Sequence, residues 1–363
     1  MIPFLNLVPG PDAAEVRAAI DRVVTRGWFV LGPELDAFEQ EFAAAVGAAH
    51  TVGVGTGTDA LALALRAAGI TAGDDVITAP VSAAYSALAI MMAGARPVFA
   101  DVDPDRLTLD PATVEQAITP KTRAMMPVHL YGQPADMASL MRIAAKHDLV
   151  VIEDCCQAHL ATCAGRPVGS FGVAAAYSCY PTKNLGARGD GGAITTNSAE
   201  LAARLRRLRN GGQTDRYHHG EFGVNSRLDE MQAAILRARL SWLPRWTDER
   251  RRIAAEYRRQ LHGAPVTVPA EHDGGHVYHL FPILTPQRTA LQAHLQGRGI
   301  ETLIHYPIPI PRQPALASQQ PSPCAVADRV CAEVLSLPLH PGMSSADVAA
   351  VAAAVHAFKP VTP

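Results

Sequence analysis

The sequence predicts an α/β protein: a large domain with a mostly parallel seven-stranded sheet flanked by helices, then a smaller α+β domain. From about residue 50 to 200, short β-rich runs alternate with Ala- and Leu-rich helical stretches, which favours a parallel sheet covered on both faces. After about residue 228 longer helices rich in Ala, Arg and Glu replace this pattern. The 363 residues, 48% of them hydrophobic, are enough for two domains, which we place at 1–240 and 241–363.

The large domain is expected to alternate strands with helices along the chain. The strands are predicted at Val52–Val54, Val76–Thr78, Pro97–Ala100, Ala124–Val128, Val150–Glu153, Ala174–Ser178 and Ala193–Thr196. Helices are predicted at Asp59–Ala68, Ser86–Ala93, Met137–Lys146 and Ala199–Arg207. In sheets of this kind the ligand site lies at the carboxyl ends of the strands.

The smaller domain is expected to combine helices with short strands. Long helices are predicted at Asp229–Leu240 and Asp248–Leu261, followed by a strand-like run at Val277–Leu284. A last helix is predicted near Ala346–Phe358, with Ser344 or Ser345 as its cap. The Pro-rich stretch from Tyr306 to Pro323 is expected to form a loop at the border of the site.

Composition argues against several classes of protein. Lys plus Arg is 32 and Asp plus Glu is 34, so no basic excess suggests a nucleic-acid partner. The first residues lack the layout of a signal peptide, and the most apolar stretch, Ala83 to Ala95, is shorter than the ~20 residues that span a bilayer. The six cysteines form no C-x-x-C pair, so neither a metal site nor a disulfide framework is expected. We therefore expect a cytoplasmic protein with no membrane partner.

The most informative residue is Lys183, in the loop Ser178-Cys-Tyr-Pro-Thr-Lys-Asn-Leu-Gly-Ala-Arg-Gly-Asp-Gly-Gly192 between two predicted strands. A lysine that is partly desolvated has a lowered pKa, and its neutral amine can form an imine with a carbonyl compound. Taken alone, a lysine beside Gly-rich turns is more often an ordinary loop residue.

A carboxylate and an amide follow the predicted strand at 150–153. Asp154 stands at the strand end, where an acid aimed into a crevice can pair with a protonated ring nitrogen, although capping a turn is its commoner role. Gln157 can donate an amide hydrogen to a phenolate-like oxygen, or be a generic loop amide.

A Gly-rich turn, Thr51-Val-Gly-Val-Gly-Thr-Gly-Thr-Asp59, leads from a predicted strand into a helix. Backbone N–H groups at a helix start bind phosphate, and Gly55 and Gly57 allow its close approach. Thr58 stands where a dinucleotide fingerprint needs its third glycine, and no Gly-Lys-Ser/Thr follows, so a nicotinamide oxidoreductase and a P-loop protein are disfavoured. An imine-forming lysine, an acid and a phosphate cradle together describe a site for pyridoxal 5'-phosphate (PLP).

The order of the motifs resembles the DegT/DnrJ/EryC1/StrS group of PLP-dependent sugar aminotransferases, a branch of the aspartate aminotransferase type I fold, over nearly the whole chain. The matching segments are Gly32-Pro33 with Phe38-Glu39, Gly57-Thr-Asp-Ala-Leu61, Pro127-Val-His-Leu-Tyr-Gly-Gln-Pro134, Glu153-Asp154 with Gln157-Ala-His159, Tyr180-Pro-Thr-Lys-Asn-Leu-Gly186, Gly189-Asp-Gly-Gly192, Asn225-Ser-Arg-Leu-Asp-Glu230 and His305-Tyr-Pro307.

The resemblance implies roles for residues that match the family's motifs. Lys183 would carry the cofactor as an imine and move protons, and Asp154 would pair with the pyridine nitrogen. Gln157 would contact the ring hydroxyl oxygen. The phosphate would be bound by Gly57, Thr58 and Ser178.

The resemblance also implies partners and substrates. Asn225 would reach the phosphate of the neighbouring subunit's cofactor, which implies a homodimer with shared sites. Arg227 is either a contact for an anionic group of the amino donor or sugar nucleotide, or an ordinary surface arginine. His305 and Tyr306 are carried over as substrate-binding residues.

Two positions depart from the family's pattern. Ala83 stands where the family places an aromatic residue over the cofactor ring, and Tyr85, two residues on, either takes that part or has a core or helix-start role. Pro311 replaces a histidine of many relatives, which weakens the transfer of sugar-binding details.

The expected reaction moves an amino group from L-glutamate to a nucleoside-diphosphate keto sugar and gives an amino sugar for glycan or secondary-metabolite biosynthesis. The Asn225–Glu230 segment resembles that of enzymes that aminate C-3 keto sugars, which favours C-3 over C-4. Lys183 argues against the sugar dehydratases of the same fold, which carry histidine there. A keto-cyclitol aminotransferase stays open. A regulator that binds PLP or a sugar nucleotide without turnover would not need the full set of site residues.

Overall fold

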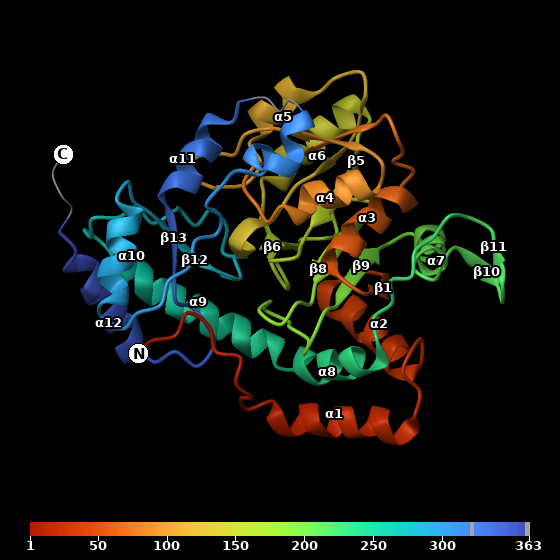
Figure 1. Ribbon diagram of the computed structural model, residues 1–363, viewed down its shortest axis with the longest axis horizontal. Coiled ribbons are helices and arrows are strands. Elements are labelled where there is room, and N and C mark those ends of the chain that lie inside the picture. Colours follow the sequence, from red (N-terminus) through yellow and green to blue (C-terminus); the bar gives the residue numbers. More distant parts are fainter. Residues whose placement is uncertain (320–322, 360–363) are drawn as a thin grey trace.

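The computed structural model describes residues 1–319 and 323–359 and contains the predicted seven-stranded sheet, in the order β1-β9-β8-β5-β4-β2-β3 (Figure 1). All seven predicted strands are present, as β1 (His50–Val54), β2 (Asp75–Thr78), β3 (Arg96–Phe99), β4 (Thr122–Met126), β5 (Val150–Asp154), β8 (Ala174–Ser178) and β9 (Gly192–Thr196). The central pairs are parallel, and only β9 runs antiparallel to both of its neighbours, β1 and β8. The mostly parallel α/β fold is therefore confirmed.

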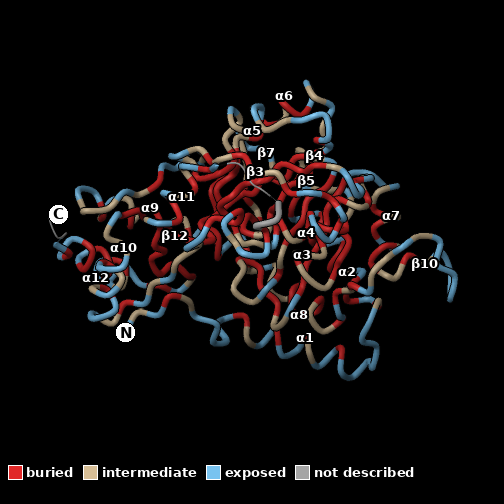
Figure 2. The backbone as a smooth tube through the Cα atoms, turned by 45° about the horizontal axis from the view of Figure 1, so that its top comes forward, coloured by how far each residue is buried: buried red, intermediate tan, exposed pale blue. Residues whose placement is uncertain are grey.

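Both faces of the sheet are apolar, because successive side chains of a strand point to opposite faces. On β8, Ala174 and Ala176 pack with α3, α4 and α7, whereas Ala175 and Tyr177 pack with α2 and α8. These helices are α2 (Pro33–Val46), α3 (Gly57–Ala67), α4 (Tyr85–Met92), α7 (Ala199–Leu208) and α8 (Glu230–Leu240). Figure 2 shows the buried centre of this layered unit.

The remaining elements lie around this unit. They are α1 (Ala13–Arg26), α5 (Pro111–Ala117), α6 (Met137–His147), the two-stranded pair β6 (Thr162–Cys163) and β7 (Arg166–Pro167), and the hairpin β10 (Gln213–Asp215) and β11 (His218–His219), with a short 3-10 turn at Leu130–Gly132. Helices α1 and α2 were not predicted. In Figure 1 the β10–β11 hairpin stands out from the body beside α7.

The C-terminal unit is built on β12 (Phe281–Leu284) paired antiparallel with β13 (Val334–Leu337). Its core includes apolar residues of α9 (Leu243–Gln260), α10 (Arg288–Gln296) and α12 (Ser345–His356). The first residues of the chain also join it, since Ile2 forms a bridge with Ile300. The proposed division at 240/241 stays a prediction.

The expected elements of this unit differ from the structure in detail. Helix α9 begins at Leu243, five residues before the predicted start, with a proline in its first turn, where the missing N–H costs nothing. The predicted strand from Val277 shortens to β12, because Val277 and Leu280 instead donate backbone hydrogen bonds to Gly132 and Tyr131. Ser344, not Ser345, caps α12, in a reciprocal pair with Asp347.

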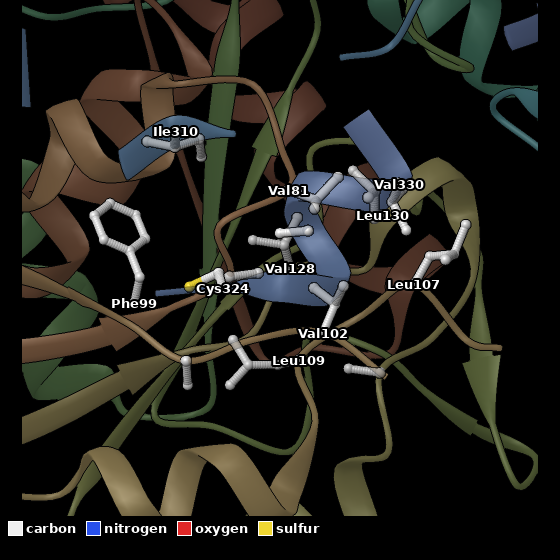
Figure 3. Close-up of a cluster of buried hydrophobic side chains, with 14 of the residues drawn as sticks. Val81, Phe99, Val102, Leu107, Leu109, Val128, Leu130, Ile310, Cys324 and Val330 are labelled. Atoms are coloured by element: carbon white, nitrogen blue, oxygen red, sulfur yellow. The ribbon is translucent and has the colours of Figure 1, made fainter. Parts of the chain in front are cut away.

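The segment that follows residue 305 crosses back onto the large sheet. The Pro-rich stretch was expected to be a loop, but most of its described part forms two 3-10 helices, at Ile310–Arg312 and Pro314–Gln319; positions 320–322 lie outside the described residues. Helix α11 (Ala325–Glu333) follows and donates the N–H groups of Val326 and Ala327 to Asp101. Figure 3 shows the apolar cluster that holds this segment, including Val81, Phe99, Val102, Leu107, Leu109, Val128, Leu130, Ile310, Cys324 and Val330.

Among the described residues, none of the helices combines the length and the apolar character that a membrane crossing needs.

Candidate active site

A cavity of about 560 Å³ lies at the carboxyl ends of β5 and β8, against the N-termini of α3 and α4. Eight of the predicted site residues line it: Gly57, Thr58, Tyr85, Asp154, Gln157, Ser178, Lys183 and Tyr306. The sheet places these residues together although they are spread over 250 positions of the sequence, as expected for a site at the strand ends.

Lys183 lies in a tight loop directly after β8. Its backbone N–H donates to the carbonyl of Tyr180 at 2.8 Å, and a side chain at Gly186 would come within 2.4 Å of the carbonyl oxygen of Pro181. Burial lowers the pKa of the Lys183 amine, and the nearby Cys156 and Asp154 oppose this shift only in part. The cavity therefore favours the neutral amine, the form that reacts with carbonyl carbon.

Asp154 ends β5 and is 4% exposed. Its Oδ2 accepts a hydrogen bond from the Ser86 hydroxyl at 2.8 Å, and its Oδ1 accepts one from the backbone N–H of Cys156 at 3.1 Å. Sequence reasoning missed Ser86, which sits in the first turn of α4. The only available signal was its position in the first turn of a helix that starts at this edge of the sheet.

The neighbouring Glu153 fixes the end of β5 from the opposite side. Its buried carboxylate accepts three backbone N–H groups of the loop 169–172, at 2.7 to 2.8 Å, and lies 3.2 Å from Nε2 of His129. A carboxylate bound this fully is rigid, so the strand end that carries Asp154 is held in one position.

Gln157 has its amide oriented by two partners. Its Oε1 accepts the backbone N–H of Tyr131 at 2.7 Å, and its Nε2 donates to the hydroxyl of Tyr306 at 3.0 Å. Tyr131 has a φ of 59°, unusual for a non-glycine residue. Burial raises the pKa of Tyr306 to about 12, so its phenol is neutral. The donor end of Gln157 thus faces the cavity that Tyr306 lines.

The N-terminus of α3 forms an anion cradle. Thr56 caps the helix by accepting the N–H of Asp59 at 3.0 Å, whereas the N–H groups of Gly57 and Thr58 precede the first intrahelical bond and face the cavity wall. A Cβ atom at Gly57 would lie 2.7 Å from Cβ of Ser178. A side chain here would collide with Ser178, so glycine lets the start of α3 lie against the end of β8 and places the free N–H groups of Gly57 and Thr58 beside Ser178, an arrangement that fits a bound phosphate.

One wall of the cavity is where an aromatic residue is expected to cover the cofactor ring. Ala83 and Tyr85 both line it, and Tyr85 is 61% exposed. The structure thus brings Tyr85 to the cavity, and stacking of its ring on the cofactor stays a prediction.

Three predicted residues do not line this cavity within one protomer. Asn225 is exposed, and Arg227 donates to Oδ1 of Asn210 at 2.9 Å. Between them, Ser226 accepts the N–H of Gly55 at 3.0 Å, which ties their loop to the cradle.

The third, His305, lines a neighbouring cavity of about 470 Å³ and lies 3.0 Å from the Ser336 hydroxyl through Nδ1. Burial lowers its pKa to about 4.

The desolvated lysine, the anchored carboxylate and the helix N-terminus form separate walls of one cavity, and this donor set fits PLP. Comparison with known families agrees, because the model of the DegT/DnrJ/EryC1/StrS aminotransferase family matches residues 11–356. The chain belongs to this family.

Relatives of this DegT/DnrJ/EryC1/StrS aminotransferase match it over almost its whole length. It is 49% identical to the dTDP-3-amino-3,4,6-trideoxy-alpha-D-glucose transaminase of Streptomyces venezuelae, over 94% of this chain and 91% of the relative. It is 46% identical to a pleiotropic regulatory protein of Geobacillus stearothermophilus, over 94% of both chains. It is 45% identical to the UDP-N-acetyl-3-dehydro-alpha-D-glucosamine 3-aminotransferase of Acidithiobacillus ferrooxidans, over 98% and 97%.

The crystal structure of DesV from S. venezuelae, in complex with a ketimine intermediate, superimposes on the aminotransferase with a TM-score of 0.95. The two chains are 47% identical, and the match covers 98% of this chain and 97% of the other. Membership of the family and this likeness make the protein an aminotransferase that uses PLP.

Proposed function

We propose that this aminotransferase transfers the amino group of L-glutamate to the C-3 keto group of a sugar linked to a nucleoside diphosphate, giving a 3-amino sugar for glycan or secondary-metabolite biosynthesis. The observation that carries the proposal is the cavity in which Lys183, Asp154 and the N-terminus of α3 meet. The choice of C-3 rests on the relatives named for dTDP- and UDP-linked 3-amino sugars.

PLP supplies an electron sink for the carbon from which a proton is removed. Lys183 is the general base and general acid of the transfer. Its neutral amine accepts at Nζ the proton that leaves the α-carbon of the amino donor, and then donates it to a neighbouring carbon. Asp154 would keep a proton on the ring nitrogen, because a buried carboxylate stabilises a positive charge beside it. Ser86 orients this carboxylate through Oδ2.

The other residues position the groups that react. Gln157 would offer Nε2, which also donates to Tyr306, to the ring hydroxyl oxygen, and the N–H groups of Gly57 and Thr58, with the Ser178 hydroxyl, would bind the phosphate. Tyr306, half-buried beside Gln157, lines the cavity and would offer a neutral hydroxyl to the sugar. His305 lies on the sugar side, in the adjoining cavity that shares Thr182.

The active enzyme is proposed to be a homodimer with shared sites, working in the cytoplasm. Asn225 and Arg227 are on the outer side of a loop that Ser226 ties to Gly55 and Asp59, beside the cradle. In the proposed dimer, Asn225 would bind the cofactor phosphate of the second subunit and Arg227 an anionic group of its substrate.

A regulatory role is the second candidate, because one relative is named a pleiotropic regulatory protein. A regulator needs to bind PLP or a sugar nucleotide but needs no general base. The desolvated Lys183 amine favours turnover over binding alone.

A substrate panel tests the proposal. The enzyme, loaded with PLP and given L-glutamate, should aminate nucleotide-linked 3-keto sugars faster than the 4-keto isomers or keto-inositols, with one 2-oxoglutarate released per amino sugar. A preference for the 4-keto isomers or the keto-inositols would refute the C-3 assignment. Binding of the sugar nucleotides without any amination would instead favour the regulatory role.

A further inference from the structure

A second cavity, of about 310 Å³, lies on the other side of the Lys183 loop. It is enclosed by the first residues of the chain, by the loop after β8 and by the beginning of α9. Thr182 and Lys183 line both this cavity and the active-site cavity, so their segment is the wall between the two. The function described above uses no other residue of the second cavity.

The walls of the second cavity carry an excess of arginine. Arg239 pairs with Asp12 at 2.9 Å, and Arg245 pairs with Glu249 at 3.1 Å, so each of these charges is balanced. In contrast, Arg188 donates to a backbone carbonyl, that of Leu7, at 3.0 Å.

Arg250 is the second arginine without a balancing charge, and it is 4% exposed. Its Nη1 donates to the backbone carbonyls of Tyr278, His279 and Leu339 at 3.1 to 3.3 Å. Within residues 1–319 and 323–359, neither Arg188 nor Arg250 forms an ion pair with a carboxylate.

Two nitrogens of the Arg250 guanidinium lack hydrogen-bond partners, which indicates a ligand. Its Nε is buried without a hydrogen-bond partner, and over the described chain its Nη2 has none either. Burial lowers the pKa of Arg250 to about 10, so the group stays charged at neutral pH. Nε2 of His340, in the same wall, is also buried and unpartnered. Nε is covered by protein atoms, so Nη2 is the nitrogen that Arg250 can offer to an anion in the cavity, through a charge-assisted hydrogen bond.

A buried cation without a counter-charge is costly, and an anion in the cavity removes this cost. Two unbalanced guanidinium groups on one small cavity suit a molecule with two negative ends. We propose that this cavity is a second anion site, separate from the reaction, which takes a small dicarboxylate through Arg250 and Arg188. The inference goes beyond the proposed function and does not depend on which sugar is aminated.

The site would link dicarboxylate concentration to the state of the lysine. A negative charge behind Lys183 stabilises the protonated form of its nitrogen. The amino donor and co-product of the proposed reaction are dicarboxylates, and so are many other metabolites. All of these molecules carry two carboxylates on a short chain. A comparison of 2-oxoglutarate with succinate therefore shows whether the ligand comes from the enzyme's own reaction or from other metabolites.

Calorimetric titration of the PLP-loaded enzyme with glutarate tests the proposal, because glutarate has neither an amine nor a keto group and cannot react. Binding should weaken about tenfold or more in Arg188→Met and in Arg250→Lys, since each loses a charge-assisted contact. The double variant Arg245→Gln/Glu249→Gln is the matched control: it removes an ion pair from the same cavity without changing the net charge of its walls, and should bind as the wild type does. The pH midpoint of the cofactor's absorbance change should rise with glutarate in the wild type but not in Arg188→Met.

Arg188→Met keeps the test decisive even if Arg250→Lys fails to fold, because Arg188 bonds a single carbonyl. No glutarate binding to the wild type, or equal binding to wild type and Arg188→Met, would overturn the proposal. So would inorganic phosphate that binds more tightly than glutarate. If 2-oxoglutarate binds at least as tightly as succinate in an Arg188-dependent way, the ligand comes from the enzyme's own reaction; the reverse order assigns the site to other dicarboxylates.

Discussion

At the scale of single residues, the proposed amino transfer depends on Lys183, whose desolvated amine has a lowered pKa. Lys183→Ala should reduce amino transfer by at least about 10³-fold, because both the imine-forming nitrogen and the base are lost. PLP should still bind to the variant without a covalent link, since the cradle at Gly57 and Thr58 is untouched. Product formation and borohydride trapping of PLP on the protein measure the two effects, and transfer at the wild-type rate would be incompatible with the assignment.

The buried lysine also predicts how stability depends on pH. Because its pKa in the folded protein lies below the ordinary value of 10.5, the unfolded chain binds more protons between these two pKa values. Lys183 therefore destabilises the cofactor-free protein most at pH values below its folded pKa, and this penalty fades as the pH rises from there toward 10.5. Lys183→Met should be more stable than the wild type near about pH 7, by a margin that shrinks at higher pH.

Urea unfolding of the cofactor-free proteins over a pH series measures this margin. Lys121→Met, at an exposed position, is the control and should show no such trend. A margin for Lys183→Met that is the same at every pH would mean that the amine is not desolvated.

Ser86 is predicted to be a positioning residue for Asp154. Ser86→Ala removes the 2.8 Å hydrogen bond to Oδ2 and should lower kcat about tenfold, with a smaller effect on KM for glutamate. The pH at which the cofactor's absorbance changes should shift as well, which a purely structural role would not produce. Ser86→Thr should restore both properties, and a failure of this rescue would count against a role for the hydroxyl.

At the scale of secondary structure, the N-terminus of α3 carries the prediction for cofactor binding. Gly57→Ala places a methyl group 2.7 Å from Cβ of Ser178 and 3.1 Å from Sγ of Cys156, which would push the start of α3 away from Ser178 and separate the groups proposed to bind the phosphate. The affinity for PLP should fall about tenfold or more, as measured by equilibrium titration of the cofactor-free enzyme. Gly274→Ala, where a Cβ meets nothing within 4 Å, should bind PLP normally. Equal affinities for the two variants would exclude α3 as the cradle.

The elements also show what can be derived from this sequence. The seven strands of the large sheet and the position of Lys183 after one of them were predictable, because buried parallel strands form short apolar runs bounded by loop residues. Ser86 was not, because its role depends on a contact between residues 68 positions apart. The same limit applied to Arg250, whose missing counter-charge becomes visible only when three carbonyls from distant segments surround one nitrogen.

At the scale of the whole molecule, the shared sites of the proposed homodimer can be tested by mixing. A chain with Lys183→Ala and a chain with Asn225→Ala should each be impaired alone. If Asn225 serves the neighbour's cofactor, a hybrid dimer has one intact site, made of Lys183 from one chain and Asn225 from the other. Random mixing should then recover up to about a quarter of wild-type activity. Mixtures no more active than the sum of the two variants would disprove shared sites.

Amino transfer from glutamate in this cavity can be measured in a single turnover. The PLP-loaded enzyme is mixed with L-glutamate in the absence of any sugar, and 2-oxoglutarate and cofactor absorbance are followed together. We expect about one 2-oxoglutarate per Lys183 site, a simultaneous loss of the lysine-linked cofactor absorbance, and neither change in Lys183→Ala. A fully loaded wild-type enzyme that binds glutamate yet releases no 2-oxoglutarate would contradict the proposed amino transfer.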